Sequence, residues 1–179
     1  MDEPDPQILN SARRGDTRAF ETLVRAYQAD VWRLCLHLTN SPSLADDVTQ
    51  DAFVRIFRFL PRYRGDSKFS TWVFAIARNC ALDELRRKKR RQVLAERAHM
   101  EREAEPKEQS SGIEVRDAVA ALPLQLREPI VLIDMFGESY RDAAIALGVP
   151  EGTVKSRVHR ARRMLVEALG QADWNSDEI

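Results

Sequence analysis

A chain of 179 residues, 31% charged and 44% hydrophobic, has the composition of a globular protein with one medium domain or two small ones. Its 28 basic and 28 acidic side chains cancel, so the net charge gives no indication of nucleic-acid binding. Because no apolar run reaches membrane-spanning length and the start MDEPDPQ lacks the basic region of a secretion signal, we expect a cytoplasmic protein without membrane insertion.

Three helices are predicted in the first sixty residues. The pair Asp5-Pro6 starts a short helix that runs to Gly15, and Asp16 or Thr17 caps a second helix whose apolar residues follow a 3.6-residue period. A third helix is expected from Ser43 to Leu60, with Ser43 as its cap.

The third helix carries a polar face with Asp46, Asp47, Gln50 and Asp51. Carboxylates beside phosphates repel them, so this face is unsuited to DNA. A basic protein partner is the better fit.

A loop, an aromatic cluster and a basic helix follow one another between Tyr63 and Arg91. The polar loop leads into an apolar helix pattern at Thr71, which ends in six consecutive cations from Arg86. Phosphates attract cations, and unpaired bases stack on aromatic rings, so the segment suggests a nucleic-acid surface. The alternative is a core helix that buries Trp72 and has a solvated basic end.

The second half of the chain has short helical patterns only. Residues 93–112 are charged and polar, and we interpret them as an interdomain linker, helical at first and flexible later. Helical patterns follow at about residues 113–121, 126–135, 139–147 and 152–169, and the acidic tail 171–179 is expected to be disordered. No alternating strand is apparent. We therefore predict an all-α chain with two small helical domains, residues 5–92 and 113–170, joined by a flexible linker.

The segment from Tyr140 to Leu165 has the pattern of a helix-turn-helix, with Gly148 at the turn. The exposed side of its second helix is rich in hydroxyl, amine and guanidinium groups, as reading of a major groove requires. These residues are Thr153, Lys155, Ser156, Arg157, His159 and Arg160. An ordinary basic helical hairpin is the alternative.

Cys35 and Cys80 lie far apart in apolar patterns without metal-ligand spacing, so we expect reduced core residues and no metal or cofactor.

Four segments together resemble a bacterial sigma factor of the extracytoplasmic function (ECF) group, in the sigma-70 family. They are ADDVTQDAF from Ala45, YRGDSKFSTW from Tyr63, IARN from Ile76 and GVPEGTVKSRVHRAR from Gly148. The resemblance covers about residues 8–169.

The resemblance implies that the first domain is sigma region 2. Asp47 and Gln50, flanked by Asp46 and Asp51, match positions that grip the β′ clamp helices of core RNA polymerase. The segment around the loop matches the element that melts promoter DNA and reads the −10 element, where a flipped base is captured. The residues that this assigns to −10 DNA are Arg64, Gly65, Asp66, Ser67, Lys68, Phe69, Trp72, Asn79, Arg86 and Arg87. Trp72 is either a wedge at the edge of the melted bubble or a core residue, with the core slightly favoured.

The resemblance further implies that the second domain is sigma region 4, which reads the −35 element and contacts the β flap. Its DNA-binding residues would be Thr153, Lys155, Ser156, Arg157, His159, Arg160 and Arg162, with Arg157 and Arg162 on phosphates. The linker would run through the active-site cleft and RNA exit channel of the polymerase. An anti-sigma factor is a further expected partner, and the chain itself would not be an enzyme.

Two other functions are compatible with parts of the sequence. A stand-alone helix-turn-helix regulator explains the second domain but leaves the segment from Ala45 to Arg91 without a role. A magnesium-dependent nuclease would use Asp46, Asp47, Asp83 and Glu84, yet adjacent residues on a helix point about 100° apart and do not converge on one ion.

Overall fold

The computed structural model describes residues 3–98 and 115–175, with side chains described through Ala95 and Gly170, and these ranges contain helices and turns but no strand. The amino-terminal half consists of α1 (Pro6–Arg13), α2 (Thr17–Thr39), α3 (Pro42–Phe59), a 3₁₀ turn η1 (Leu60–Arg62) and α4 (Phe69–Ala98). The carboxy-terminal half consists of α5 (Val115–Ala121), α6 (Leu124–Ile130), a π-helical continuation η2 (Val131–Met135), α7 (Tyr140–Leu147) and α8 (Glu151–Asn175). The prediction of an all-α chain is confirmed.

Local sequence signals set most helix starts. The Asp5 side chain accepts a hydrogen bond from the backbone N–H of Gln7, and the Asp16 side chain caps α2 through Arg18 and Ala19. The cap of α3 is Ser41 and not Ser43 as predicted, because Pro42 occupies the first helical position and leaves the preceding residue to cap.

The amino-terminal half is a bundle in which α2, α3 and α4 pack against one another. Val31, Leu34 and Phe74 are among its fully buried residues. Cys35 and Cys80 lie in this core as free thiols, and burial raises their pKa values to about 12 and about 11. Both thiols are therefore protonated and unreactive at neutral pH.

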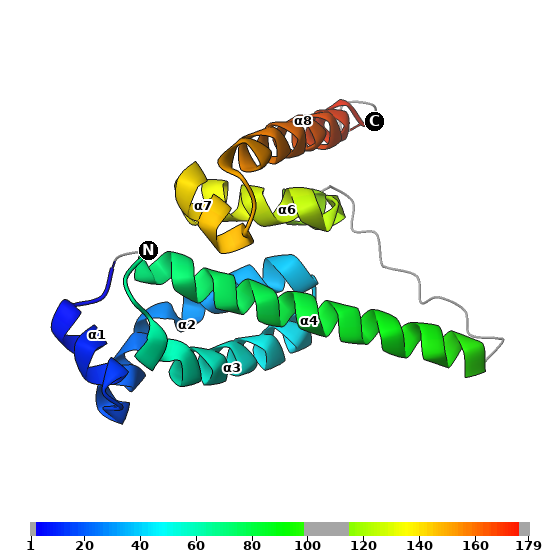
Figure 1. The fold of residues 1–179 in the computed structure, drawn as a ribbon. Coiled ribbons are helices and arrows are strands. Elements are labelled where there is room, and N and C mark those ends of the chain that lie inside the picture. The colour runs from blue at the N-terminus through cyan, green and yellow to red at the C-terminus, as the bar shows by residue number, and fades with distance from the viewer. Residues whose placement is uncertain (1–2, 99–114, 176–179) are drawn as a thin grey trace.

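The carboxy-terminal half packs directly on the amino-terminal half. In Figure 1, α4 lies between α2 and α3 on one side and α6 and α7 on the other, with α8 as the outermost layer. Buried residues of both halves belong to one hydrophobic cluster.

Two helices extend into the stretches that flank the predicted domains. The helix α4 continues to Ala98, so the first part of the predicted linker is helical, while residues 99–112 of that linker lie outside the described range. The helix α8 continues to Asn175, five residues into the stretch expected to be disordered, and residues 176–179 lie outside the described range. Across residues 3–98 and 115–175, no helix combines the length and hydrophobicity needed to cross a bilayer.

Candidate nucleic-acid interface

The predicted DNA-reading loop is closed by its own side chains. The Tyr63 hydroxyl donates a 2.6 Å hydrogen bond to the carbonyl of Ser67, across the turn at Gly65. Gly65 has a φ of +80°, where a β-carbon would be strained, so this position favours glycine. Arg64 and Asp66 are exposed at the tip of the loop.

The amino terminus of α4 is capped by a residue from the start of the chain. Both Glu3 carboxylate oxygens accept hydrogen bonds, from the backbone N–H of Phe69 at 2.8 Å and of Ser70 at 3.2 Å. A carboxylate at a helix amino terminus satisfies unpaired N–H groups and interacts favourably with the helix dipole. The helix therefore begins at Phe69, two residues before the predicted start.

Phe69 was expected to contact DNA, but its side chain is only 1% exposed in this structure. Its ring packs edge-on against Tyr27 at 5.3 Å and Tyr63 at 5.4 Å. Phe69 thus attaches the loop to α2. Trp72 is half-buried and packs against Tyr63 at 5.2 Å, so one side of the indole belongs to the core and part of it is accessible.

The basic end of α4 projects past the rest of the molecule (Figure 1). Arg86 and Arg87 are exposed, and each guanidinium lies near a carboxylate one turn back, 3.5 Å from Asp83 and 3.6 Å from Glu84. Such exposed ion pairs contribute little to stability, so these arginines can exchange their carboxylate partners for DNA phosphates. Asn79 is exposed on the same helix.

The helices α7 and α8 form the predicted helix-turn-helix. Gly148 ends α7 with a φ of +65°, and Leu147, Val154 and Val158 are buried between the two helices. Lys155, Ser156, His159 and Arg160 are exposed on the first turns of α8, whereas Thr153 and Arg157 are half-buried.

On α8, two of the predicted DNA-binding cations already have acidic partners. The Lys155 ammonium lies 2.7 Å from Glu151, and this hydrogen bond raises the pKa of Lys155. Arg162 donates to both carboxylate oxygens of Asp134 in η2, at 2.6 and 3.1 Å. A two-point contact fixes the guanidinium plane, so Arg162 holds α8 against η2.

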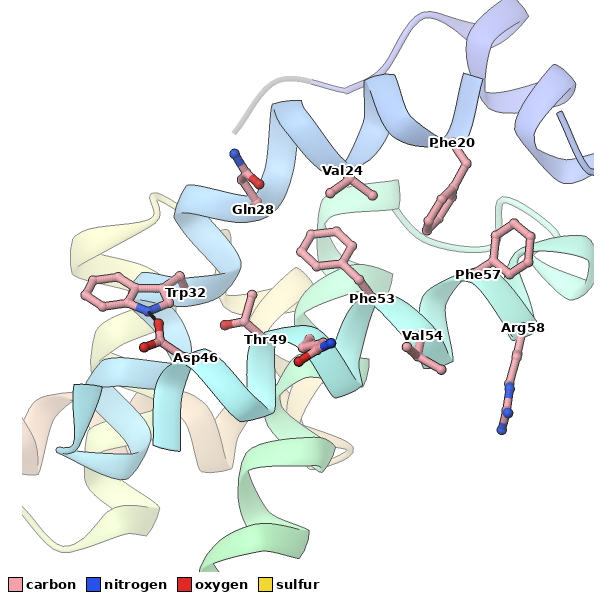
Figure 2. A pocket seen from close by; sticks show the side chains of 11 residues that line it. Phe20, Val24, Gln28, Trp32, Asp46, Thr49, Phe53, Val54, Phe57 and Arg58 are labelled. Atoms are coloured by element: carbon pink, nitrogen blue, oxygen red, sulfur yellow. Dashed lines mark hydrogen bonds between the residues drawn. The ribbon is translucent and has the colours of Figure 1, made fainter. Parts of the chain in front are cut away.

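The polar face of α3 borders an apolar groove that the sequence analysis did not find. Asp47, Gln50 and Asp51 are exposed, while Asp46 accepts a 2.7 Å hydrogen bond from the Trp32 indole N–H. The groove between α2 and α3 has a volume of about 630 Å³ (Figure 2). It is lined by Phe20, Val24, Gln28, Trp32, Asp46, Thr49, Gln50, Phe53, Val54, Phe57 and Arg58. Aromatic residues spaced four apart on α3, at Phe53 and Phe57, were the available signal.

Comparison with known proteins identifies the two halves. Residues 23–91 match the family described as Sigma-70 region 2, and residues 113–165 match Sigma-70 region 4. The ECF RNA polymerase sigma factor SigC of Mycobacterium tuberculosis is 37% identical over 182 residues, covering 99% of this chain and 95% of SigC. The chain belongs to the sigma-70 family.

Other sigma factors are similar over most of their length. The RNA polymerase sigma-H factor of Pseudomonas aeruginosa is 37% identical, and the match covers 93% of this chain and 94% of the sigma-H factor. The solved structure of CnrH with the cytosolic domain of CnrY has a TM-score of 0.69 at 27% identity, covering 92% of this chain and 96% of CnrH. The sigma factor RpoE of Bartonella quintana, solved with the anti-sigma factor NepR, has a TM-score of 0.69 at 28% identity, covering 84% and 96%.

Membership of the ECF group decides between the alternatives. Sigma factors are non-catalytic initiation factors, so this sigma factor is not a nuclease. Region 2 also accounts for the segment from Ala45 to Arg91, which a stand-alone regulator would leave without a role. Asp83 pairs with Arg55 at 3.0 Å, and Glu84 pairs with Arg91. Among the residues described in the two halves, no three His, Cys, Asp or Glu side chains gather as a metal ion would need.

Proposed function

We propose that this sigma factor directs core RNA polymerase to promoters through three separate surfaces. The observation that carries the proposal is the exposure of four polar and basic residues on the first turns of α8, in a chain that also contains region 2. They are Lys155, Ser156, His159 and Arg160. Only a surface open to solvent can enter a major groove.

The −35 surface is the exposed side of α8. His159 and Arg160 offer side chains for base edges, and Lys155 must exchange Glu151 for DNA. Thr153 and Arg157, half-buried at its border, would reach the backbone of the duplex. Arg162 contributes by holding α8 in place through Asp134.

The −10 surface consists of the loop and the exposed side of α4. Arg64, Asp66, Ser67 and Lys68 surround the loop, whose shape depends on Gly65 and on Phe69 beneath it. Extruding a base from the duplex costs a few kcal/mol, and stacking and hydrogen bonds to the edge of the base must offset this cost. The accessible part of Trp72 and the amide of Asn79 would do so, with Arg86 and Arg87 on phosphates.

The polymerase surface is the groove between α2 and α3 with its polar rim. An apolar groove bordered by Asp47, Gln50 and Asp51 fits an amphipathic helix with basic flanks, and the β′ clamp helices are the proposed occupant. In region 4, a hollow of about 310 Å³ that includes Val119, Ile130 and Met135 is the proposed contact for the β flap.

The family suggests a proposal for regulation and location. CnrH and the Bartonella RpoE were solved with CnrY and with an anti-sigma factor, respectively, and we propose that an anti-sigma factor also controls this protein. The promoters would belong to a stress or envelope-responsive regulon, and the protein would act in the cytoplasm with the polymerase.

Transcription in vitro tests the proposal. Purified core polymerase from the source organism, with and without this protein, is given a genomic promoter library, and the transcripts are sequenced. We expect starts that occur only with the protein and share −10 and −35 bases. The absence of protein-dependent starts, with folded protein and active core, would refute the sigma role.

Paired variants test the division of labour. Asp47→Ala with Gln50→Ala should weaken binding to core polymerase, whereas Lys155→Ala with Arg160→Ala should spare it and reduce use of the −35 element. Equal loss of core binding in both folded variants would contradict the assignment.

A further inference from the structure

A small hollow lies where α5 packs against the end of α2, and we call it the α2–α5 hollow. Its walls come from α2, from the residue that ends α2, from the first residue of α3 and from α5. Its volume of about 300 Å³ is at the lower end of the range for pockets that bind small molecules. The space therefore suits one small molecule and not a partner helix.

The apolar wall of the α2–α5 hollow is formed by Trp32, Leu36, Pro42 and Ala120. The Trp32 indole N–H donates a 2.7 Å hydrogen bond to Asp46, which fixes the orientation of the ring (Figure 2). Because the only polar atom of this side chain is already used, Trp32 offers the hollow apolar ring surface. Such a wall suits a flat apolar group.

The polar wall is formed by His37, Asn40 and Arg116. Asn40 ends α2 in the left-handed conformation and is exposed. The Arg116 guanidinium lies 3.8 Å from Asp117, which is longer than a hydrogen bond. Arg116 therefore keeps hydrogen-bond donors that a ligand can use.

The charge around this wall is positive. Burial lowers the pKa of His37, and so do the charges of three arginines from three different helices, Arg127, Arg116 and Arg33. The hollow proposed for the β flap shares His37 and contains Asp134, but both oxygens of Asp134 accept hydrogen bonds from Arg162. A negatively charged ligand would balance the positive potential at His37.

Arg127 holds the two sides of the α2–α5 hollow together. Its guanidinium donates to the carbonyls of His37 and Leu38 at 3.3 and 3.4 Å, and to those of Ala120 and Leu122. Two of these four residues, His37 and Ala120, line the hollow from opposite helices. The acceptors are carbonyls and not a carboxylate, so the charge of Arg127 is not neutralised by its partners. The site is thus both held in shape and left with positive charge.

We propose that the α2–α5 hollow binds a small aromatic anion, with its ring on Trp32, Leu36 and Pro42 and its anionic group on Arg116 and Asn40. A few convergent polar groups beside an apolar wall are typical of small-ligand sites. Hydrogen bonds from a guanidinium to an anion are among the strongest available, and they offset the loss of water from the ligand. The site is separate from the three surfaces of the proposed function and does not depend on them.

Phenyl phosphate is the probe, because it joins an aromatic ring to an anionic group. It is titrated at millimolar concentrations and low salt into the full-length protein, while NMR follows the Trp32 indole N–H and the His37 ring. Inorganic phosphate supplies the charge without the ring, and benzyl alcohol supplies the ring without the charge. We expect signals of both residues to shift, and phenyl phosphate to bind at least about tenfold more tightly than either half-probe.

Two variants should weaken the binding of phenyl phosphate. Arg116→Gln removes the guanidinium and should raise the Kd about tenfold. Ala120→Leu fills part of the hollow with a good helix former and should abolish binding. The matched control is Arg25→Gln, which also removes one exposed arginine from an acidic partner but does not line the hollow, and it should leave the Kd unchanged.

Four outcomes would overturn the proposal. The first is the absence of shifts at Trp32 and His37, and the second is an equal rise in the Kd for Arg116→Gln and Arg25→Gln, which would reduce the effect to net charge. The third is inorganic phosphate binding as tightly as phenyl phosphate. The fourth is unchanged affinity in folded Ala120→Leu, which would place the probe elsewhere. If Ala120→Leu does not fold, the comparison of the two exposed arginines decides.

Discussion

The groove between α2 and α3 allows a quantitative prediction for Phe57→Ala. Phe57 lines the groove and its side chain remains 43% exposed. A phenylalanine contributes about 200 Å² of surface, so about 85 Å² is available for a partner to cover. At about 25 cal/mol per Å² this is about 2 kcal/mol of binding, or roughly a 30-fold rise in the Kd for core polymerase.

The fold should tolerate this change. Phe57 meets Phe20 edge-on at 4.9 Å, and the loss of such a pair costs about 1 kcal/mol beyond the lost burial. The assay is competition with labelled wild-type protein for core polymerase, after a melting curve has shown that the variant is folded.

The matched control is Phe59→Ala. Phe59 lies on the same helix and is 45% exposed, but it does not line the groove. We expect its removal to leave the affinity for core polymerase unchanged. If both variants lose affinity equally, or if Phe57→Ala binds as well as the wild type, the groove is not the polymerase contact.

Three further predictions concern stability, pH and salt. Phe69→Ala should lower the free energy of unfolding by about 3–5 kcal/mol in urea, because it removes a buried ring, and a loss below about 1 kcal/mol would return Phe69 to the DNA surface. Burial, and then the charges of Arg127, Arg116 and Arg33, lower the pKa of His37. A depressed histidine pKa gives stability that is complete above pH 6.5 and is lost as the pH falls through the pKa of the folded protein. The urea concentration at the unfolding midpoint should therefore decrease as the pH is lowered from 6.5, and His37→Gln should remove the part of this decrease that His37 causes. Lys155→Ala should reduce the salt dependence of duplex binding by about one ion, whereas Arg162→Ala should not, and equal slopes for the two variants would contradict the roles given to these side chains.

Features encoded by neighbouring residues could be predicted from the sequence. The apolar period of α2, the caps Asp5 and Asp16 and the turn at Gly148 each depend on residues within one or two helical turns. The same holds for the exposed side of α8, since an apolar pattern that places Val154 and Val158 inside also places Lys155 and His159 outside.

Contacts between distant segments could not be predicted in this way. Glu3 caps a helix that begins 66 residues later, and no spacing rule links the two. Phe69 is an aromatic residue of the kind that stacks on bases, and only the position of Tyr27 on another helix shows that the Phe69 ring is buried. Ser41 and Ser43 are equally good caps by composition, and Pro42 between them decided the register.

The packing of the two halves was missed for a related reason. The polar stretch after Arg91 indicated a flexible connection, and the segment around Glu138 has the composition of a surface turn. Glu138 is buried because it meets Thr71, and the complementarity of such a pair is invisible until the helices are placed in space.

The cap that Glu3 places on α4 has a practical consequence for handling the protein. Any affinity tag or fluorescent protein fused before Met1 would end within a few residues of the loop that is proposed to contact single-stranded promoter DNA. Such a fusion would perturb the DNA binding that an assay measures. A Glu3→Gln preparation would show how much of the loop geometry depends on this carboxylate.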